Sequence, residues 1–129
     1  MRQTYVFDTS AILETLKRSP SYEKYRAFHI ITTKLNLFEV SYCVLTDYDT
    51  NLSELFLQNY YPLAKNLSLK TIQKAVQLKQ TYRKFSITQC IGYALAMQLK
   101  IPFLTSDKAF QSLPSVEYVP IQIDNGTRS

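Results

Sequence analysis

The chain contains few of the residues that break regular structure or build flexible loops. Among its 129 residues are two glycines and five prolines, and there is no repeat or low-complexity segment. Two glycines leave little material for a glycine-rich phosphate loop, which argues against a flavodoxin-like nucleotide-binding domain. No apolar run approaches the roughly 20 residues that cross a bilayer, and the N-terminus lacks a signal-peptide layout. We expect one domain over residues 1–129, located in the cytoplasm and not in a membrane.

Cysteine is also scarce. Cys43 and Cys90 lie in apolar surroundings and form no C-x-x-C pair. Reduced core thiols are expected, with a buried disulfide as the alternative. Hydrophobic residues make up 46% of the chain and charged residues 19%, which is typical of a globular protein with a sizeable core.

Acidic residues are outnumbered, so that the formal net charge is +5 and the pI is near 9.2. No acid occurs between Glu54 and Asp107, while basic residues recur in this interval. They either guide a polyanion such as an RNA backbone or form an ordinary solvated helix face. Those within residues 65–84 are Lys65, Lys70, Lys74, Lys79, Arg83 and Lys84.

Tyrosine, by contrast, occurs ten times. Several tyrosines could stack on unpaired bases, although core and interface positions are the more usual use. These are Tyr22, Tyr25, Tyr42, Tyr48, Tyr60 and Tyr61.

Short apolar runs alternate with segments of helical periodicity. The runs predict strands at residues 4–7, 29–33, 62–66, 101–105 and 116–121. Helices are expected from Ala11 to Arg18, over 21–26, from an Asn36 cap to Thr46, over 53–59, over 69–84, and from Ser86 or Thr88 to Lys100, with a helical turn over 107–113. The alternation predicts an α/β protein with three α/β/α layers and a central parallel sheet of about four to five strands.

Two aspartates stand at equivalent strand ends. Asp8 follows TYVF directly, and Asp107 follows PFLT with only Ser106 between. Ligands of parallel sheets sit beyond the carboxyl ends of the strands. If the two strands are neighbours, the carboxylates converge and repel each other unless a cation lies between them, and Mg²⁺ suits such oxygen ligands. The alternative is that both aspartates cap the helices that follow.

A third acid, Glu39, lies within a helical segment, NLFEVSY. It either forms an ion pair with a lysine or joins the two aspartates. The one histidine, His29, begins an expected strand, so a structural role is expected for it.

Three segments together resemble one known family. VFDTSAIL (6–13), NLFEV (36–40) and GYALAMQLKIPFLTSDKAF (92–110) resemble the PIN domain, especially its VapC-like toxin ribonucleases. The resemblance implies an acidic cluster that binds Mg²⁺ or Mn²⁺ at the C-terminal edge of the sheet. It assigns catalysis and metal binding to Asp8, Glu39 and Asp107, and supporting hydrogen bonds to Ser10 and Thr105.

The sequence departs from this family pattern at Gln89, where the family usually has an aspartate. An amide oxygen can ligate a metal but carries no charge and cannot act as a base. We therefore expect weaker metal binding.

The resemblance implies a metal-dependent endoribonuclease, the toxin of a toxin–antitoxin pair, that forms a homodimer and binds an antitoxin over its active-site groove. The alternative is a catalytically inactive PIN-fold module that binds RNA or a protein partner. The residues expected to line the antitoxin groove are Tyr42, Leu45, Leu52, Leu55 and Phe56.

Overall fold

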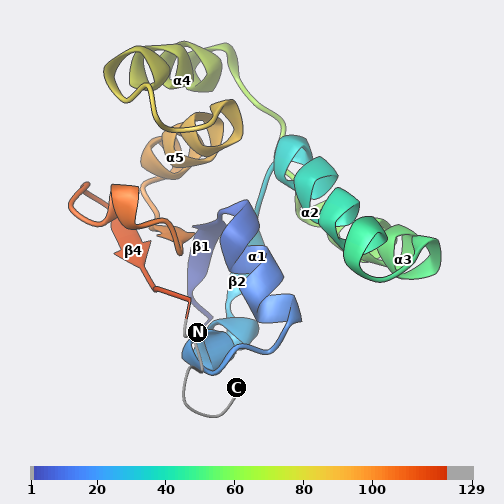
Figure 1. Cartoon of the computed structure of the whole chain (residues 1–129). Coiled ribbons are helices and arrows are strands. Elements are labelled where there is room, and N and C mark those ends of the chain that lie inside the picture. The colour runs from blue at the N-terminus through green and yellow to red at the C-terminus, as the bar shows by residue number, and fades with distance from the viewer. Residues whose placement is uncertain (1, 122–129) are drawn as a thin grey trace.

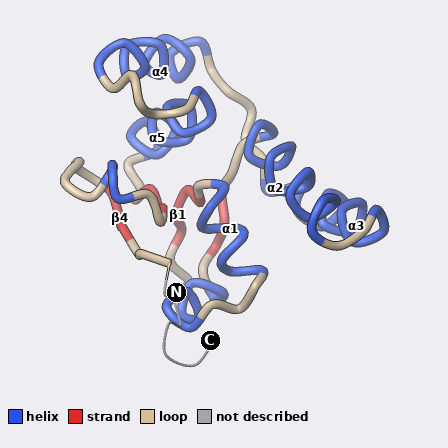
Figure 2. Tube along the Cα trace, viewed as in Figure 1, coloured by secondary structure: helices blue, strands red, loops and turns tan. Residues whose placement is uncertain are grey.

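A four-stranded parallel sheet organises the computed structural model, which describes residues 2–121 (Figures 1 and 2). Its order is β2-β1-β3-β4, so β1 lies inside the sheet and Val6 pairs with both Ile31 and Phe103. The predicted parallel sheet is confirmed. The strands are β1 (Thr4–Phe7), β2 (His29–Ile31), β3 (Phe103–Thr105) and β4 (Val116–Tyr118).

Helices cover both faces of this sheet, as expected for strands that alternate with helices. Tyr5 and Phe7 of β1 join one buried cluster, and Val6 between them joins the other. The first cluster includes side chains of α1 (Thr9–Leu16), the 3₁₀ helix η1 (Pro20–Ala27), α2 (Lys34–Asp47) and α3 (Thr50–Tyr60). The second includes side chains of α4 (Leu69–Thr81), α5 (Ile87–Leu99) and the 3₁₀ helix η3 (Lys108–Phe110).

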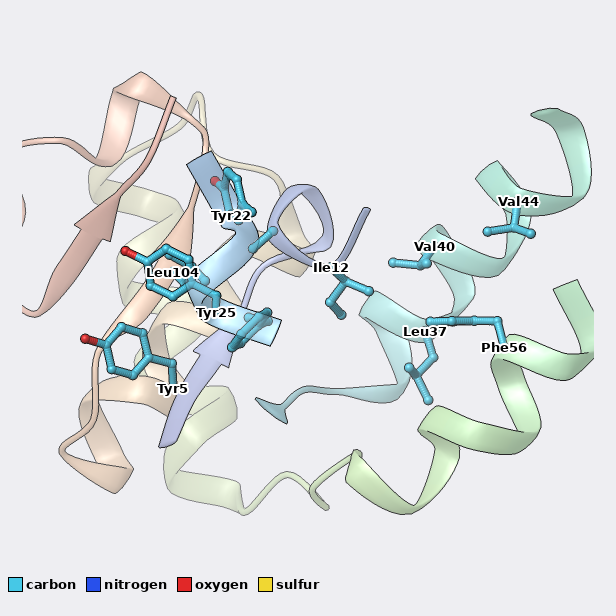
Figure 3. Packing of buried hydrophobic residues seen from close by; sticks show 11 residues of the cluster. Tyr5, Ile12, Tyr22, Tyr25, Leu37, Val40, Val44, Phe56 and Leu104 are labelled. Carbon is cyan, nitrogen blue, oxygen red and sulfur yellow. The ribbon is translucent and has the colours of Figure 1, made fainter. Parts of the chain in front are cut away.

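The first cluster is long and reaches well beyond the sheet. Figure 3 shows its labelled side chains running from Tyr5 and Tyr25 beside the strands to Val44 and Phe56 on α2 and α3. These last two helices pack against each other as a pair that extends away from the sheet (Figure 1). The pair therefore leaves much of its own surface uncovered.

The strand expected at residues 62–66 is wrong. Tyr61–Leu63 forms a 3₁₀ helix, η2, and only Ala64 bridges to Thr32 at the edge of the sheet. Pro62 lies in the first turn of η2, where its fixed φ and its missing N–H suit a helical turn. The sheet has four strands as a result.

Several expected helix starts are displaced. Asp8, rather than Thr9 or Ser10, caps α1, and Thr33, rather than Asn36, caps α2. Asp49 starts α3 before the expected Ser53. Ser68 and Ser86 cap α4 and α5 as predicted, Ser86 with a full capping box.

Helix α4 is shorter than the expected span of 69–84. It ends at Thr81, and residues 82–86 form a loop that leads into α5. Cys43 and Cys90 are both free thiols, and Cys90 is buried. Within residues 2–121, no helix combines the length and apolar character that a membrane span requires.

Candidate functional site

The site lies at the C-terminal edge of β1 and β3. Because these strands are parallel neighbours, with Phe7 opposite Leu104, the residues after them meet at one edge. The N–H of Asp8 donates to the carbonyl of Leu104 at 2.9 Å, which fixes the two chain segments side by side. Asp8 and Asp107 thus share the neighbourhood that their positions in the sequence predict.

An open cleft of about 400 Å³ brings the candidate residues together. Asp8, Glu39 and Asp107 all line it, and Gln89 completes the set from the first turn of α5. No lysine or arginine is among its lining residues, which also include Thr9, Ser10, Leu13, Ser86 and Ser106.

Asp8 is the most buried acid of the cleft. Its Oδ1 accepts a hydrogen bond from the Thr9 N–H at 2.9 Å, and its Oδ2 accepts one from the Thr105 hydroxyl at 2.8 Å. Burial raises the pKa of Asp8 to about 6, and the nearby Glu39 adds to the rise, although hydrogen bonds from Thr105, Thr9 and Gln89 lower it. Within residues 2–121, no lysine or arginine forms a salt bridge with this carboxylate to offset the desolvation.

Thr105, expected to support the cluster, connects both aspartates. Its hydroxyl donates to Asp8 and accepts the backbone N–H of Asp107 at 3.1 Å. Ser10, the other expected support, bonds the backbone instead, where its hydroxyl accepts the N–H of Ser106 at 3.1 Å. Ser10 therefore holds the loop after β3 and not a carboxylate.

Glu39 is held by two residues for which the sequence predicts no such role, Thr9 and Asn36. The Thr9 hydroxyl donates to Glu39 Oε1 at 2.6 Å and accepts from the Asn36 side-chain amide at 2.9 Å. The side-chain oxygen of Asn36, Oδ1, accepts a hydrogen bond from the hydroxyl of Thr33 at 2.6 Å. Since Asn36 is fully buried and donates to Thr9, the single hydroxyl proton of Thr9 is directed at Glu39.

Gln89 faces the acids with its amide nitrogen. Nε2 donates to Asp107 Oδ2 at 2.8 Å, while Oε1 accepts the N–H of Ser86 in the capping box. An aspartate at this position would instead add a negative charge beside Asp107. Compared with an aspartate at this position, Gln89 therefore makes the cleft one charge less negative. It also stabilises the carboxylate of Asp107 by a hydrogen bond.

The capping alternative for the two aspartates also holds. Asp8 is the N-cap of α1, and Asp107 is the N-cap of η3, where its Oδ1 accepts the N–H of Ala109. Capping occupies one oxygen of each carboxylate, so it does not exclude a second role for the other. Glu39 forms no ion pair with a lysine, because the salt bridges within residues 2–121 join Glu14 to Lys17 and Glu23 to Arg26.

The donor set is the kind that a hard divalent cation prefers, namely the carboxylate oxygens of three acids that line one cleft. As the side chains stand, no three Asp, Glu, His or Cys residues of the described part are grouped as a metal site. In this arrangement Thr9 donates a hydrogen bond to Glu39, and Gln89 donates one to Asp107. The donor chemistry and the uncompensated charge of the cleft fit a cation of this type.

Comparison with known proteins adds a family and a fold. The family model described as the PIN domain matches residues 5–116. No curated protein matches the chain. A toxin–antitoxin complex from Klebsiella pneumoniae superposes with a TM-score of 0.73 at 19% identity, covering 92% of this chain and 99% of that one. VapBC2 from Rickettsia felis, bound to a DNA fragment from its promoter, has a TM-score of 0.69 at 15% identity, covering 91% and 99%.

Proposed function

The chain belongs to the PIN domain family, and from this premise we propose that it is a cytoplasmic, metal-dependent endoribonuclease that acts as the toxin of a toxin–antitoxin pair. The observation that carries the proposal is that Asp8, Glu39 and Asp107 line one cleft, with no lysine or arginine among its lining residues. Carboxylates in such an arrangement repel one another unless a cation joins them. The fold neighbours, titled as toxin–antitoxin and VapBC complexes, support the toxin role.

Asp8, Glu39 and Asp107 would hold Mg²⁺ or Mn²⁺. When bound, the cation supplies the charge that activates a water for in-line attack and screens the phosphate in the transition state. The chain's own groups orient this set: Thr105 joins the two aspartates, and Thr9 fixes Glu39. No histidine is needed for this chemistry, in keeping with the position of His29 on β2, outside the cleft.

Cleavage of RNA in the presence of Mn²⁺ tests the proposal. We expect Asp8→Asn to reduce the rate about 100-fold or more, because it removes the most buried carboxylate of the set. Gln89→Asp is expected to raise the rate about 10-fold, since it restores charge beside Asp107. Cleavage that survives Asp8→Asn unchanged contradicts the proposal.

Thermal unfolding provides a readout that is independent of turnover. A cation that binds only the native state at 100 times its Kd stabilises that state by about 2.7 kcal/mol. Mn²⁺ should therefore raise the Tm of the wild-type chain and leave the Tm of Asp8→Asn nearly unchanged. The control is Glu54→Gln, which alters an exposed acid on α3 away from the cleft.

A second candidate function is a PIN-fold module that binds RNA or protein without turnover. The observation that favours it is Gln89, whose amide hydrogen-bonds Asp107 and so reduces the need for a cation there. Under this alternative, Mn²⁺ does not shift the Tm, and Gln89→Asp lowers stability without creating activity.

The antitoxin is proposed to bind an apolar groove of about 380 Å³ beside α2 and α3. Leu13 lines both this groove and the carboxylate cleft, so a segment lying in the groove reaches the active site. None of the five residues expected to line the active-site groove lines the carboxylate cleft itself. Leu52, Leu55 and Phe56 line this neighbouring groove, whereas Tyr42 and Leu45 are exposed outside it.

A further inference from the structure

Three exposed cations lie close in the chain to residues that line the carboxylate cleft. Arg83 and Lys84 lie three and two residues before Ser86, which lines the cleft, and Lys108 directly follows Asp107. We call Arg83, Lys84 and Lys108 the cationic rim. Within residues 2–121 none of the three is salt-bridged to an acid, because both salt bridges there lie elsewhere.

Lys79 fixes the loop that carries Arg83 and Lys84 through hydrogen bonds to the backbone of that loop. The Lys79 ammonium donates to the carbonyl of Arg83 at 2.8 Å and to that of Phe85 at 2.6 Å. Hydrogen bonds from a charged donor are the stronger kind, so this lysine holds the loop on both sides of Lys84. Lys79 thus acts inside the fold, while the two exposed cations after it direct their charge at solvent.

Aromatic stacking ties the two rim segments to each other. Phe85 is buried and stacks on Phe110, with ring centroids 3.9 Å apart and planes 15° apart. Tyr82 stacks in turn on Phe85, with centroids 5.0 Å apart. Since Phe110 ends the η3 helix that Asp107 caps, Arg83, Lys84 and Lys108 belong to one packed unit beside the acids.

We propose that the cationic rim binds the phosphates of single-stranded RNA that flank the phosphate held in the carboxylate cleft. This inference rests on the proposed function, because it takes the cleft as the place of cleavage. The acids of the cleft repel a bare polyanion, so a strand can lie across them only if adjacent cations attract its neighbouring phosphates.

Binding of a labelled 12-nucleotide single-stranded RNA, followed by anisotropy in EDTA at several salt concentrations, tests this inference. For a single strand, each phosphate that the protein no longer neutralises reduces the slope of log K against log salt by about 0.7. The double variant R83Q/K84Q should therefore lower the slope by about 1.4 and weaken binding about 10- to 30-fold at roughly 0.1 M salt. Lys108→Gln should produce about half of that change in slope.

The matched control is K70Q/K74Q, which removes the same charge from exposed positions of α4 outside the cleft lining. It should weaken binding less than about 3-fold. An equal weakening in K70Q/K74Q, or an unchanged slope in R83Q/K84Q, overturns the inference. So does a polyglutamate peptide that binds with the same dependence on Arg83 and Lys84.

Kinetics separate this inference from the proposed function. With Mn²⁺, R83Q/K84Q should raise KM about 10-fold and leave kcat within about 3-fold, because the rim positions RNA and does not touch the reacting atoms. If the wild-type chain does not cleave RNA but the slopes change as expected, the rim stands and the nuclease proposal fails. If RNA is cleaved and the slopes are unchanged, the nuclease proposal stands and the inference about the cationic rim fails.

Discussion

Asp8 is 3% exposed and accepts hydrogen bonds from Thr9 and Thr105, yet burial raises its pKa to about 6. The ordinary pKa of an aspartate, which applies to the unfolded chain, is 3.8. The native state therefore binds the proton of Asp8 more tightly than the unfolded chain does. A rise of about two pKa units corresponds to about 3 kcal/mol. This destabilisation is absent below about pH 4, grows as the pH rises through 6, and is complete at neutral pH.

We accordingly predict that Asp8→Asn stabilises the metal-free protein at pH 7 but not at pH 4. The amide stays neutral, so the free energy of unfolding should rise by about 1–3 kcal/mol at pH 7. Urea unfolding in EDTA at the two pH values measures this, with Glu54→Gln as the control that should change it by less than about 0.5 kcal/mol. A decrease in the stability of Asp8→Asn at both pH values contradicts the prediction.

The sequence identified the acids of the site better than the side chains that hold them. Asp8 and Asp107 could be predicted because strand ends of a parallel sheet share one edge. The roles of Thr9 and Asn36 could not, since they depend on how α1 and α2 are rotated against each other. Two signals were available: the hydroxyl directly after Asp8, and the spacing of three between Asn36 and Glu39, which places both on one helix face.

Among the elements, α5 approaches the sheet most closely at Gly92. A Cβ at this position would lie 2.9 Å from Cε1 and 3.6 Å from Cζ of Phe103. Phe103 is fully buried between Tyr93 and Phe110, so its ring has little room to move. The small residues of the segment GYALA are a sequence signal for close packing of this helix. That the packing partner is Phe103 is evident only from the fold.

We predict that Gly92→Ala destabilises the protein by about 1–3 kcal/mol, because overpacking outweighs the roughly 1 kcal/mol that alanine gains in helix propensity. Phe103→Leu should relieve part of this. Urea unfolding of the four proteins of the double-mutant cycle should then give a coupling energy of at least about 1 kcal/mol. Additive effects of the two substitutions would count against the contact.

Element boundaries were less predictable than element types. Residues 61–63 form the 3₁₀ helix η2, with Pro62 near its start, in place of the strand expected over 62–66. The loop over 82–86 is held by two hydrogen bonds from Lys79 to backbone carbonyls, which no local sequence pattern predicts. That loop carries Arg83 and Lys84, two of the three residues on which the proposal for the cationic rim depends.

Across the whole molecule, the alternation of strands and helices predicted three layers and a parallel sheet. The strand order β2-β1-β3-β4 was not predictable, since β1 and β3 are separated by most of the chain and meet only through tertiary packing. That pairing nevertheless assembles the site, because it joins the edge after Phe7 to the edge after Thr105. The site is thus a property of the topology as much as of its residues.

Within residues 2–121, two exposed apolar grooves differ in their relation to the cleft. The groove beside α2 and α3 shares Leu13 with the cleft, whereas the face of α4 and α5 shares no lining residue with it. On the latter face, Val76 and Ile87 are 63% and 65% exposed. A second copy bound there leaves the cleft open to RNA, and for this reason we expect the proposed homodimer to form through α4 and α5.

Light scattering after size exclusion tests this expectation. The wild-type chain should have the mass of a dimer, and V76E/I87E should have the mass of a monomer, because two buried charges per protomer would remain unpaired in the interface. The matched variant L52E/L55E alters the groove beside α3 and should keep the dimer mass while it abolishes antitoxin binding. If L52E/L55E is instead the monomeric variant, the two faces have exchanged roles, and the second copy covers the groove that leads to the carboxylates.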